Sequence, residues 1–167
     1  MAWRRGATTY YAGGVEMAGW TNRLKNNMLA WAFRGSTLPT NYYVALFTST
    51  TPPTVDTILK SSLTEVAAGN GYTVGGIALN RNTTDFDVLT EDVTNDRALV
   101  QIRDIVWTAT GAFPSSGNGA RFVCLTDDNA TQSNREVYTY WDLSSDRSLI
   151  APQRLKLQDL ELRINEA

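Results

Sequence analysis

The sequence of 167 residues contains no histidine and a single cysteine, Cys124. Without an imidazole the chain has no Ser-His-Asp or Cys-His catalytic system and no histidine metal ligand. One cysteine excludes an internal disulfide and the usual structural zinc sets. Because Cys124 lies in the apolar run Arg121-Phe-Val-Cys-Leu125, we expect it to be a small buried core residue.

Charged residues and long apolar runs are also scarce. Charged side chains make up 19% of the chain, the formal net charge is −2 and the isoelectric point is near 5.1, so we predict no nucleic-acid partner. No segment approaches the roughly 20 apolar residues of a membrane span, and the first ten residues lack the apolar stretch of a signal peptide. We therefore expect no membrane partner and a chain that folds in a cytoplasm.

Motifs of catalysis are missing as well. The glycines of Gly69-Asn-Gly71 and Gly75-Gly76 are isolated and indicate turns rather than a phosphate-binding loop. Paired carboxylates could hydrolyse glycosides, but each available pair lies in a Thr- and Asn-rich stretch, where carboxylates cap turns or are solvated. These pairs are Asp85/Asp87, Glu91/Asp92 and Asp127/Asp128. We predict a protein that is not an enzyme, with no catalytic residue and no cofactor.

Two acidic stretches and a set of aromatic residues suggest binding sites of other kinds. Asp127-Asp-Asn129 with Asp142, or Glu91 to Asp96, offers oxygen ligands for calcium, but neither has the spacing of an EF-hand loop, so turns are favoured and no metal site is predicted. Exposed aromatic rings could form a carbohydrate platform, although those in 138–141 lie in a predicted central strand, where rings fill the core. The aromatic candidates are Tyr10, Tyr11, Tyr42, Tyr43, Tyr138, Tyr140 and Trp141.

The clearest helical pattern follows an irregular N-terminal segment, residues 1–14, which we expect to be an extended arm. Apolar residues then recur three or four positions apart from Met17 to Trp31, which predicts an amphipathic helix over 15–34. Thr21 is an N-cap candidate for a shorter helix, and Gly35 suits its C′ position. The helix either packs on its own domain or docks, with the arm, on a neighbouring subunit. The candidate contact residues are Trp3, Arg4, Arg5, Tyr10, Tyr11, Met17 and Trp20.

After Gly35 the apolar period changes from 3.6 to 2, which predicts strands over 41–49, 72–81, 97–109, 119–126, 135–142 and 154–164. Two of these strands change phase, so each needs a bulge or bend, near Arg103-Asp104 and near Gln158-Asp159. The pattern predicts a mainly β fold, an antiparallel β-sandwich of jelly-roll-like form, as a single domain over 15–167. Residues 50–70 form either a short helix or a covering loop.

Several short motifs resemble those of a known family. They are Asn41-Tyr-Tyr-Val-Ala-Leu-Phe-Thr-Ser49 before Pro52-Pro53, Thr64-Glu-Val66, Gly71-Tyr-Thr-Val-Gly-Gly-Ile77, Ile105-Val-Trp-Thr-Ala109 and Tyr140-Trp-Asp-Leu143. In these segments the chain is similar to small bacteriophage virion structural proteins of the tail-fibre-like, or head- and tail-appendage, family. The similarity extends over about residues 24–164, and the motifs are structural rather than catalytic.

The resemblance implies a non-enzymatic structural protein of the virion, a fibre-like or adaptor component of the tail, baseplate or neck. It implies contacts with other phage virion proteins and with copies of itself, as a trimer or hexamer. No shaft follows Ile164, which favours an adaptor over a complete fibre. Two alternatives stay open: a capsid decoration protein that cements the head lattice, and a carbohydrate-binding module for host-surface recognition.

Overall fold

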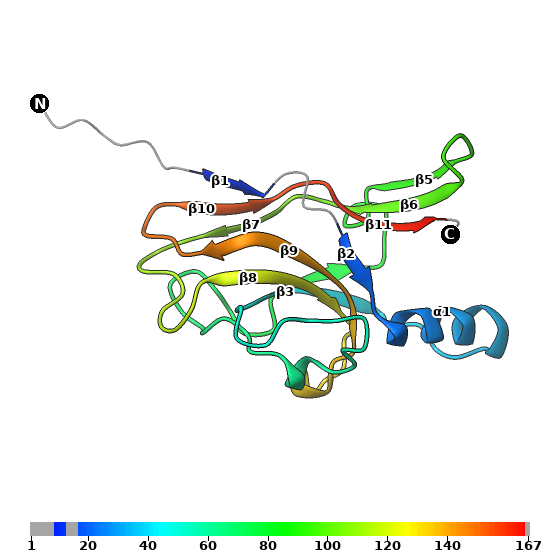
Figure 1. Cartoon of the computed structure of the whole chain (residues 1–167), viewed down its shortest axis with the longest axis horizontal. Coiled ribbons are helices and arrows are strands. Elements are labelled where there is room, and N and C mark those ends of the chain that lie inside the picture. Colours follow the sequence, from blue (N-terminus) through cyan, green and yellow to red (C-terminus); the bar gives the residue numbers. More distant parts are fainter. Residues whose placement is uncertain (1–8, 13–16, 166–167) are drawn as a thin grey trace, which may run out of the picture.

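A computed structural model describes residues 9–12 and 17–165, which form mainly antiparallel β-sheets with one α-helix (Figure 1). The helix α1 spans Asn22–Arg34, and two short 3₁₀ helices, η1 and η2, span Lys60–Ser62 and Gln132–Asn134. The strands are β1 Thr9–Ala12, β2 Met17–Trp20, β3 Asn41–Phe47, β4 Ile77–Asn80, β5 Val88–Asp92, β6 Arg97–Ile102, β7 Ile105–Thr108, β8 Ala120–Thr126, β9 Val137–Arg147, β10 Arg154–Leu157 and β11 Leu160–Asn165.

The largest sheet has five strands in the order β2-β9-β8-β3-β4, all antiparallel. Its middle strands are rich in aromatic and β-branched residues, which suit a pleated surface covered by neighbours. Cys124 lies opposite Ala45 on one side and Tyr140 on the other, and it is fully buried as predicted. The prediction that 135–142 is an interior strand is confirmed, because β9 lies between β2 and β8.

The remaining strands form two three-stranded sheets, β1-β10-β7 and β11-β6-β5. They are joined because β6 continues into β7 across Arg103-Asp104, and β10 continues into β11 across Gln158-Asp159. Since β6 pairs with β11 and β7 pairs with β10, the two breaks lie opposite each other in one long ladder. Both predicted changes of phase are confirmed, and Asp159 takes a positive φ of 55° at its break.

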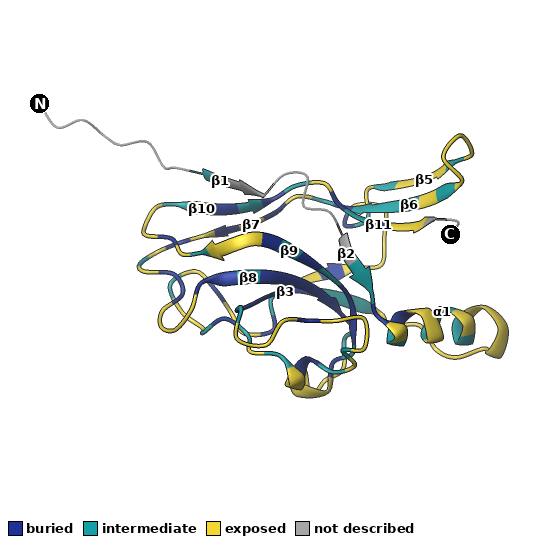
Figure 2. Cartoon of the chain, in the orientation of Figure 1, coloured by how far each residue is buried: buried dark blue, intermediate teal, exposed yellow. Residues whose placement is uncertain are grey.

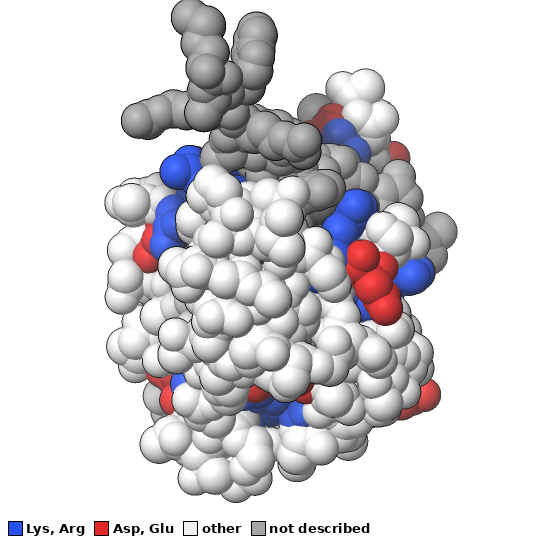
Figure 3. Space-filling model, turned by 90° about the vertical axis from the view of Figure 1, so that its left-hand side faces the viewer, with Lys and Arg blue, Asp and Glu red and all other residues white. Residues whose placement is uncertain are grey.

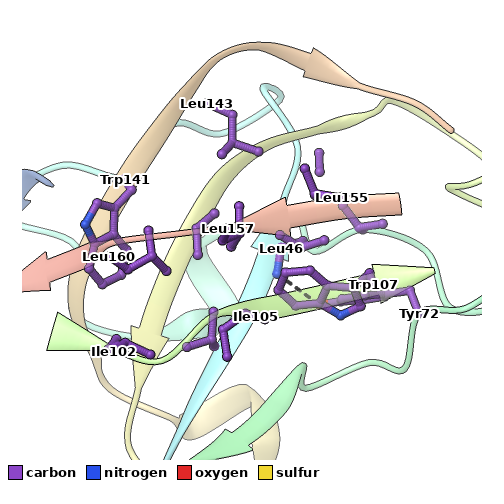
Figure 4. Close-up of a cluster of buried hydrophobic side chains, with 14 of the residues drawn as sticks. Leu46, Tyr72, Ile102, Ile105, Trp107, Trp141, Leu143, Leu155, Leu157 and Leu160 are labelled. Carbon is purple, nitrogen blue, oxygen red and sulfur yellow. Dashed lines mark hydrogen bonds between the residues drawn. The ribbon is translucent and has the colours of Figure 1, made fainter. Parts of the chain in front are cut away.

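The core lies between this ladder and the five-stranded sheet (Figure 4). Apolar side chains at alternate positions of β3, β8 and β9 meet those of β7, β10 and β11, as expected for strands with one face turned inward. The close-up labels the central members, which are Leu46, Tyr72, Ile102, Ile105, Trp107, Trp141, Leu143, Leu155, Leu157 and Leu160.

The predicted helix 15–34 is wrong at its start, because the helix begins at Asn22 and Met17–Trp20 is the strand β2. Trp20 and Gly19 pair with the edge of β9, where Thr139 Oγ1 donates a hydrogen bond to the Gly19 carbonyl over 2.8 Å. Thr21 has extended backbone (ψ 153°), and its hydroxyl accepts from Leu24 N–H, so it is the N-cap. Gly35, with φ 65°, ends the helix as predicted.

Three other features differ from the predictions. The strand expected over 72–81 is reduced to β4, because Gly75 and Gly76 turn the chain with positive φ. A Cβ on Gly76 would lie 2.0 Å from the Val44 carbonyl oxygen, so the turn needs glycine at this position.

The strand β5 was not predicted, and β1 pairs with β10 in parallel rather than antiparallel orientation. Residues 50–70 are mostly loop with η1 inside, so each alternative describes part of that segment.

Candidate functional site

Helix α1 projects from the β-sheets and is largely uncovered (Figures 1 and 2). Leu24, near its N-terminus, is its one buried residue. Further along, Leu29 is 62% exposed and Phe33 is 81% exposed. Large apolar side chains at these levels of exposure point to contacts that the described part of this chain does not supply.

The sheet β11-β6-β5 also extends beyond the core. Side chains at every second position of a strand lie on the same face of a sheet. Three successive rows of paired residues, each two positions further along the strands, therefore lie on one face of this sheet. In the first row Leu160 and Ile102 are each 1% exposed, whereas in the second Leu89 is 83% exposed. In the third row, Ile164 and Glu91 are also exposed. The face therefore passes from core to open surface along its length.

An apolar groove lies between α1 and this uncovered sheet face. It consists of two adjoining hollows of about 470 and 510 Å³, which share Trp20 and Met28 in their linings. Trp31, Tyr42 and Leu89 are among the other residues of the first hollow, and the charged residues of the lining are Arg81 in the first and Lys25 and Arg163 in the second. We call this region the apolar groove. It is concave and mostly hydrophobic, as sites that bind a partner or ligand usually are.

The N-terminal half of α1 is firmly attached, which sets the position of one wall of the groove. Thr21 Oγ1 donates to the Val137 carbonyl over 2.6 Å, and Asn27 Nδ2 donates to Glu136 over 2.6 Å. Arg23 forms an ion pair with Glu136 at 3.5 Å. These contacts hold the first turns against β9 and leave the last turns extending past the sheet.

Aromatic rings form the base of the groove. The Tyr138 ring makes edge-to-face contacts with Trp31 at 5.9 Å and with Tyr42 at 6.0 Å, and Tyr42 makes another with Phe86 at 5.6 Å. Such pairs stabilise beyond their buried area by roughly 0.5–1.5 kcal/mol each. Burial raises the pKa of Tyr42 and of Tyr138, so both phenols are neutral near pH 7. The groove floor is therefore preformed and uncharged.

Residues of the 41–49, 64–66 and 71–77 segments meet at a different place, beside β3. Glu65 forms an ion pair with Lys60 at 2.6 Å and accepts hydrogen bonds from the Tyr72 hydroxyl and from Gly75 N–H. Both side chains of the ion pair are nearly covered, which makes loss of one partner costly. Arg135 lies 3.5 Å from the centre of the Tyr43 ring and donates to the Gly75 carbonyl. These residues fasten the 60–76 loop to the sheet.

Two of the carboxylates considered for calcium, Asp127 and Asp142, are occupied by local contacts. Asp127 Oδ1 accepts from Glu136 N–H and Asn129 N–H, and Asp142 forms a two-pronged pair with Arg121. Asp142 lies opposite Phe122, at the other end of the β8–β9 ladder from Asp127, so the structure does not bring these two together. Among residues 9–12 and 17–165, acidic, cysteine and histidine side chains form no cluster of three that could hold a metal ion.

Asp85 and the aromatic rings of the possible carbohydrate platform are also held within the fold. Asp85 is buried, which alone would raise its pKa, but hydrogen bonds from Arg103 at 2.5 Å and from Asn80 lower the pKa below its ordinary value. Of the candidate platform, Tyr138 and Trp141 are buried, and the remaining rings whose side chains are described are half-buried. Those half-buried rings are Tyr42, Tyr43 and Tyr140.

The predicted contact residues have different positions. Trp3, Arg4 and Arg5 lie outside the described residues. Tyr10 and Tyr11 belong to β1, where their backbones pair with Leu155 and Lys156, and Met17 lies opposite Trp141 in β2. Trp20 lines both hollows of the apolar groove, so it is the predicted contact residue that the structure places at this candidate site.

The exposed apolar residues of α1 and β5 are not among the predicted contact residues. Leu29 and Phe33 lie outside the stripe formed by Leu24, Met28 and Trp31, and Leu89 lies in a segment interpreted as loop. Two large apolar residues off the stripe of an amphipathic helix were the available indication of a second contact face.

The end of the molecule opposite α1 has few charged side chains on its surface (Figure 3). The middle of that face is largely uncharged, and Lys, Arg, Asp and Glu lie around its margins. The connections at this end, residues 48–51, 109–119 and 148–153, contain no charged residue. They contact one another through the Phe113–Leu149 bridge and a hydrogen bond from Asn118 to Thr50. The two ends of the molecule thus differ in polarity and in shape.

Comparison with known proteins finds no matching family model, no similar curated protein and no similar solved structure. Within the described part of the chain, no helix combines the length and apolar character needed to cross a bilayer.

Proposed function

We propose that this chain is a non-enzymatic structural protein of a bacteriophage virion, a fibre-like or adaptor component of the tail, baseplate or neck that assembles by protein–protein contacts. The observation that carries the proposal is the apolar groove between α1 and the overhanging sheet β11-β6-β5. A helix whose last turn is uncovered, with Phe33 81% exposed, is suited to a role in which other subunits cover it.

The structural role of the motif residues supports the same proposal. Tyr72, Glu65 and Trp107 connect loops and sheets, and Trp141 fills the core. We further propose that the ladder and the five-stranded sheet form a β-sandwich of jelly-roll-like form, since their apolar faces meet in a single core cluster. A fold stabilised in this way presents its loops and its helix on a rigid body.

Mass spectrometry of purified particles tests the proposal. The phage that encodes the chain should carry it in its virions, in tens of copies if it belongs to the tail, baseplate or neck. Hundreds of copies would instead identify a decoration protein of the head. Absence of the chain from the particles would refute the proposal.

Complementation of a deletion phage then tests the groove. Leu89→Arg introduces a charge at an exposed position of the groove and should leave the fold intact but block assembly of infectious particles. Ile150→Arg is the matched control, because Ile150 is an exposed aliphatic residue in the uncharged connections of the opposite end. Full complementation by both variants would argue against a role for the groove in assembly.

A further inference from the structure

Helix α1 carries positive charge without any negative charge. Its residues include Arg23, Lys25 and Arg34 and no Asp or Glu. Arg23 is paired with Glu136, but Lys25 and Arg34 are exposed and have no carboxylate partner in residues 9–12 and 17–165. The uncovered part of the helix is therefore basic as well as apolar.

The hairpin formed by β5 and β6 has the opposite charge. Residues 85–97 contain five carboxylates and one arginine. Asp85 and Asp92 are neutralised by Arg103 and Arg97, at 2.5 and 2.8 Å. The other three carboxylates are exposed and lack a cationic partner in the described part of the chain; they are Asp87, Glu91 and Asp96. We call residues 85–97 the acidic hairpin.

These two elements also carry four of the five most exposed large apolar side chains in the described part of the chain. Leu29 and Phe33 belong to α1, and Leu89 and Val93 belong to the acidic hairpin. In α1 the exposed apolar residues are flanked by cations. In the acidic hairpin they are flanked by anions. This is the pattern expected of two complementary halves of an interface.

The two halves cannot meet fully within one subunit. At about 100° per residue, Leu29 and Phe33 lie roughly 140° and 180° around the helix from Leu24. Leu24 is buried on the side where α1 is attached to the sheet, and Phe33, on the opposite side of the helix, lines neither hollow of the groove. Leu29 lines the second hollow but is still 62% exposed. We call the side of the helix that carries Phe33 and the exposed part of Leu29 its outer face, and this face is open to another molecule.

We propose that α1 of one copy of this chain docks in the apolar groove of a second copy, with its outer face against the second copy's acidic hairpin. Leu29 and Phe33 then cover Leu89 and Val93, and the helix cations lie beside the hairpin carboxylates. This inference rests on the proposed function, and it names the partner as the chain itself. Each copy presents both halves, so two copies can exchange helices reciprocally, or copies can follow one another head-to-tail and form a ring such as the expected trimer or hexamer where the rotation closes.

A charge swap tests the contact in the full-length chain. One variant carries Lys25→Glu and Arg34→Glu, a second carries Asp87→Lys and Glu91→Lys, and a third carries all four changes. Arg154→Glu is the control, because Arg154 is exposed on β10 and remote from α1 (Figure 1). Light scattering after size-exclusion chromatography measures the mass at micromolar concentration, and circular dichroism checks folding.

The unmodified chain and the control should be oligomeric. Each double variant should weaken association by about tenfold or more, because like charges then face each other. The variant that carries all four substitutions should associate as the unmodified chain does. A monomeric unmodified chain, or double variants that associate as before, would overturn the proposal.

Cross-linking gives an independent result if a charge variant fails to fold. Phe33→Cys and Leu89→Cys are made in separate chains and mixed under oxidising conditions, where the native Cys124 is fully buried. A disulfide-linked pair containing one chain of each kind is expected, and Phe33→Cys mixed with Ile150→Cys should give none. No cross-link in the first mixture would contradict the proposed docking.

These outcomes are distinguishable from a failure of the proposed function. A chain that is present in virions but monomeric alone, with no Phe33–Leu89 cross-link, would leave the virion role standing and remove the self-contact. A chain that forms the ring but is absent from virions would do the reverse.

Discussion

The Tyr72 hydroxyl donates a hydrogen bond to Glu65 Oε1 over 2.7 Å and accepts one from the Leu46 backbone N–H over 3.0 Å. One phenol thereby connects the strand β3 to the loop that follows it. Burial and the neighbouring Glu65 raise the pKa of Tyr72 well above its ordinary value. The Tyr72 hydroxyl therefore keeps its proton near neutral pH and remains a hydrogen-bond donor. Val66 N–H also donates to the Leu46 carbonyl, which completes the junction.

Replacing Tyr72 with phenylalanine should destabilise the protein by about 1–3 kcal/mol, because Leu46 N–H loses its partner in a buried position. Urea unfolding monitored by tryptophan fluorescence measures the change. Tyr43→Phe is the control, since it keeps the ring over which Arg135 lies. Equal stability of the two variants would show that the Tyr72 hydroxyl contributes nothing.

Gly76 and Gly35 both have positive φ, 76° and 65°, but their surroundings differ. Gly35→Ala has open space around the new Cβ and should cost only about 1–2 kcal/mol of backbone strain. Gly76→Ala places the Cβ 2.0 Å from the Val44 carbonyl oxygen and should cost about 3 kcal/mol or more. Thermal unfolding compares the two, and similar melting temperatures would contradict the close approach of 73–76 to β3.

Asp85 should make the stability depend on pH. Its carboxylate has a pKa below the ordinary 3.8, so its contribution is complete above that value and is lost as the pH falls through the lower folded-state pKa. Asp85→Asn is therefore expected to cost about 1–2 kcal/mol at pH 7. The difference from the unmodified chain should shrink as the pH falls below 3.8.

Denaturant titrations across this pH range test the sign. Asp56→Asn serves as the control, because Asp56 is exposed and its amide replacement can still accept from Asn22. A difference between Asp85→Asn and the unmodified chain that grows toward acid pH would contradict the ion pair with Arg103.

The attachment of α1 through its first turns also predicts unequal effects along the helix. Leu24→Ala should destabilise the chain by about 2–4 kcal/mol, because it leaves a cavity in a buried position. Phe33→Ala should change the free energy of unfolding by no more than about 0.5 kcal/mol in solutions too dilute for self-association. A large cost at Phe33 under those conditions would mean that the end of α1 packs on its own subunit.

Much of the β architecture follows from local patterns. The alternation in 119–126 and 135–142, and the phase changes near Arg103-Asp104 and Gln158-Asp159, correspond to β8, β9 and the two bent strands. The start of α1 could not be read in this way, since Met17 and Trp20 fit a helical period as well as a strand. The free edge of β9 decided between them by supplying backbone partners. The strand β5 was hidden because Thr, Glu and Asp make up most of it.

The candidate site was less accessible to such reasoning. Trp20 and the stripe Leu24, Met28 and Trp31 were recognised from spacing, and they do form one wall of the apolar groove. The other wall comes from β5, β6 and β11, which are brought opposite the helix by pairings between segments about 60 residues apart, such as Gln101 with Glu161. A pattern of neighbouring residues in the sequence does not reveal that these strands lie opposite the helix.

The order of residues alone determined that the chain is mainly β with one helix ending at Gly35, that it contains no histidine, and that its one cysteine, Cys124, cannot form an internal disulfide. Tertiary structure decided which side of α1 is attached, which rows of β11-β6-β5 stay open, and that the basic helix and the acidic hairpin flank the same groove. The reason is physical. Periodicity and capping depend on neighbours along the chain, whereas burial and the pairing of charges depend on which distant segments come to lie against each other.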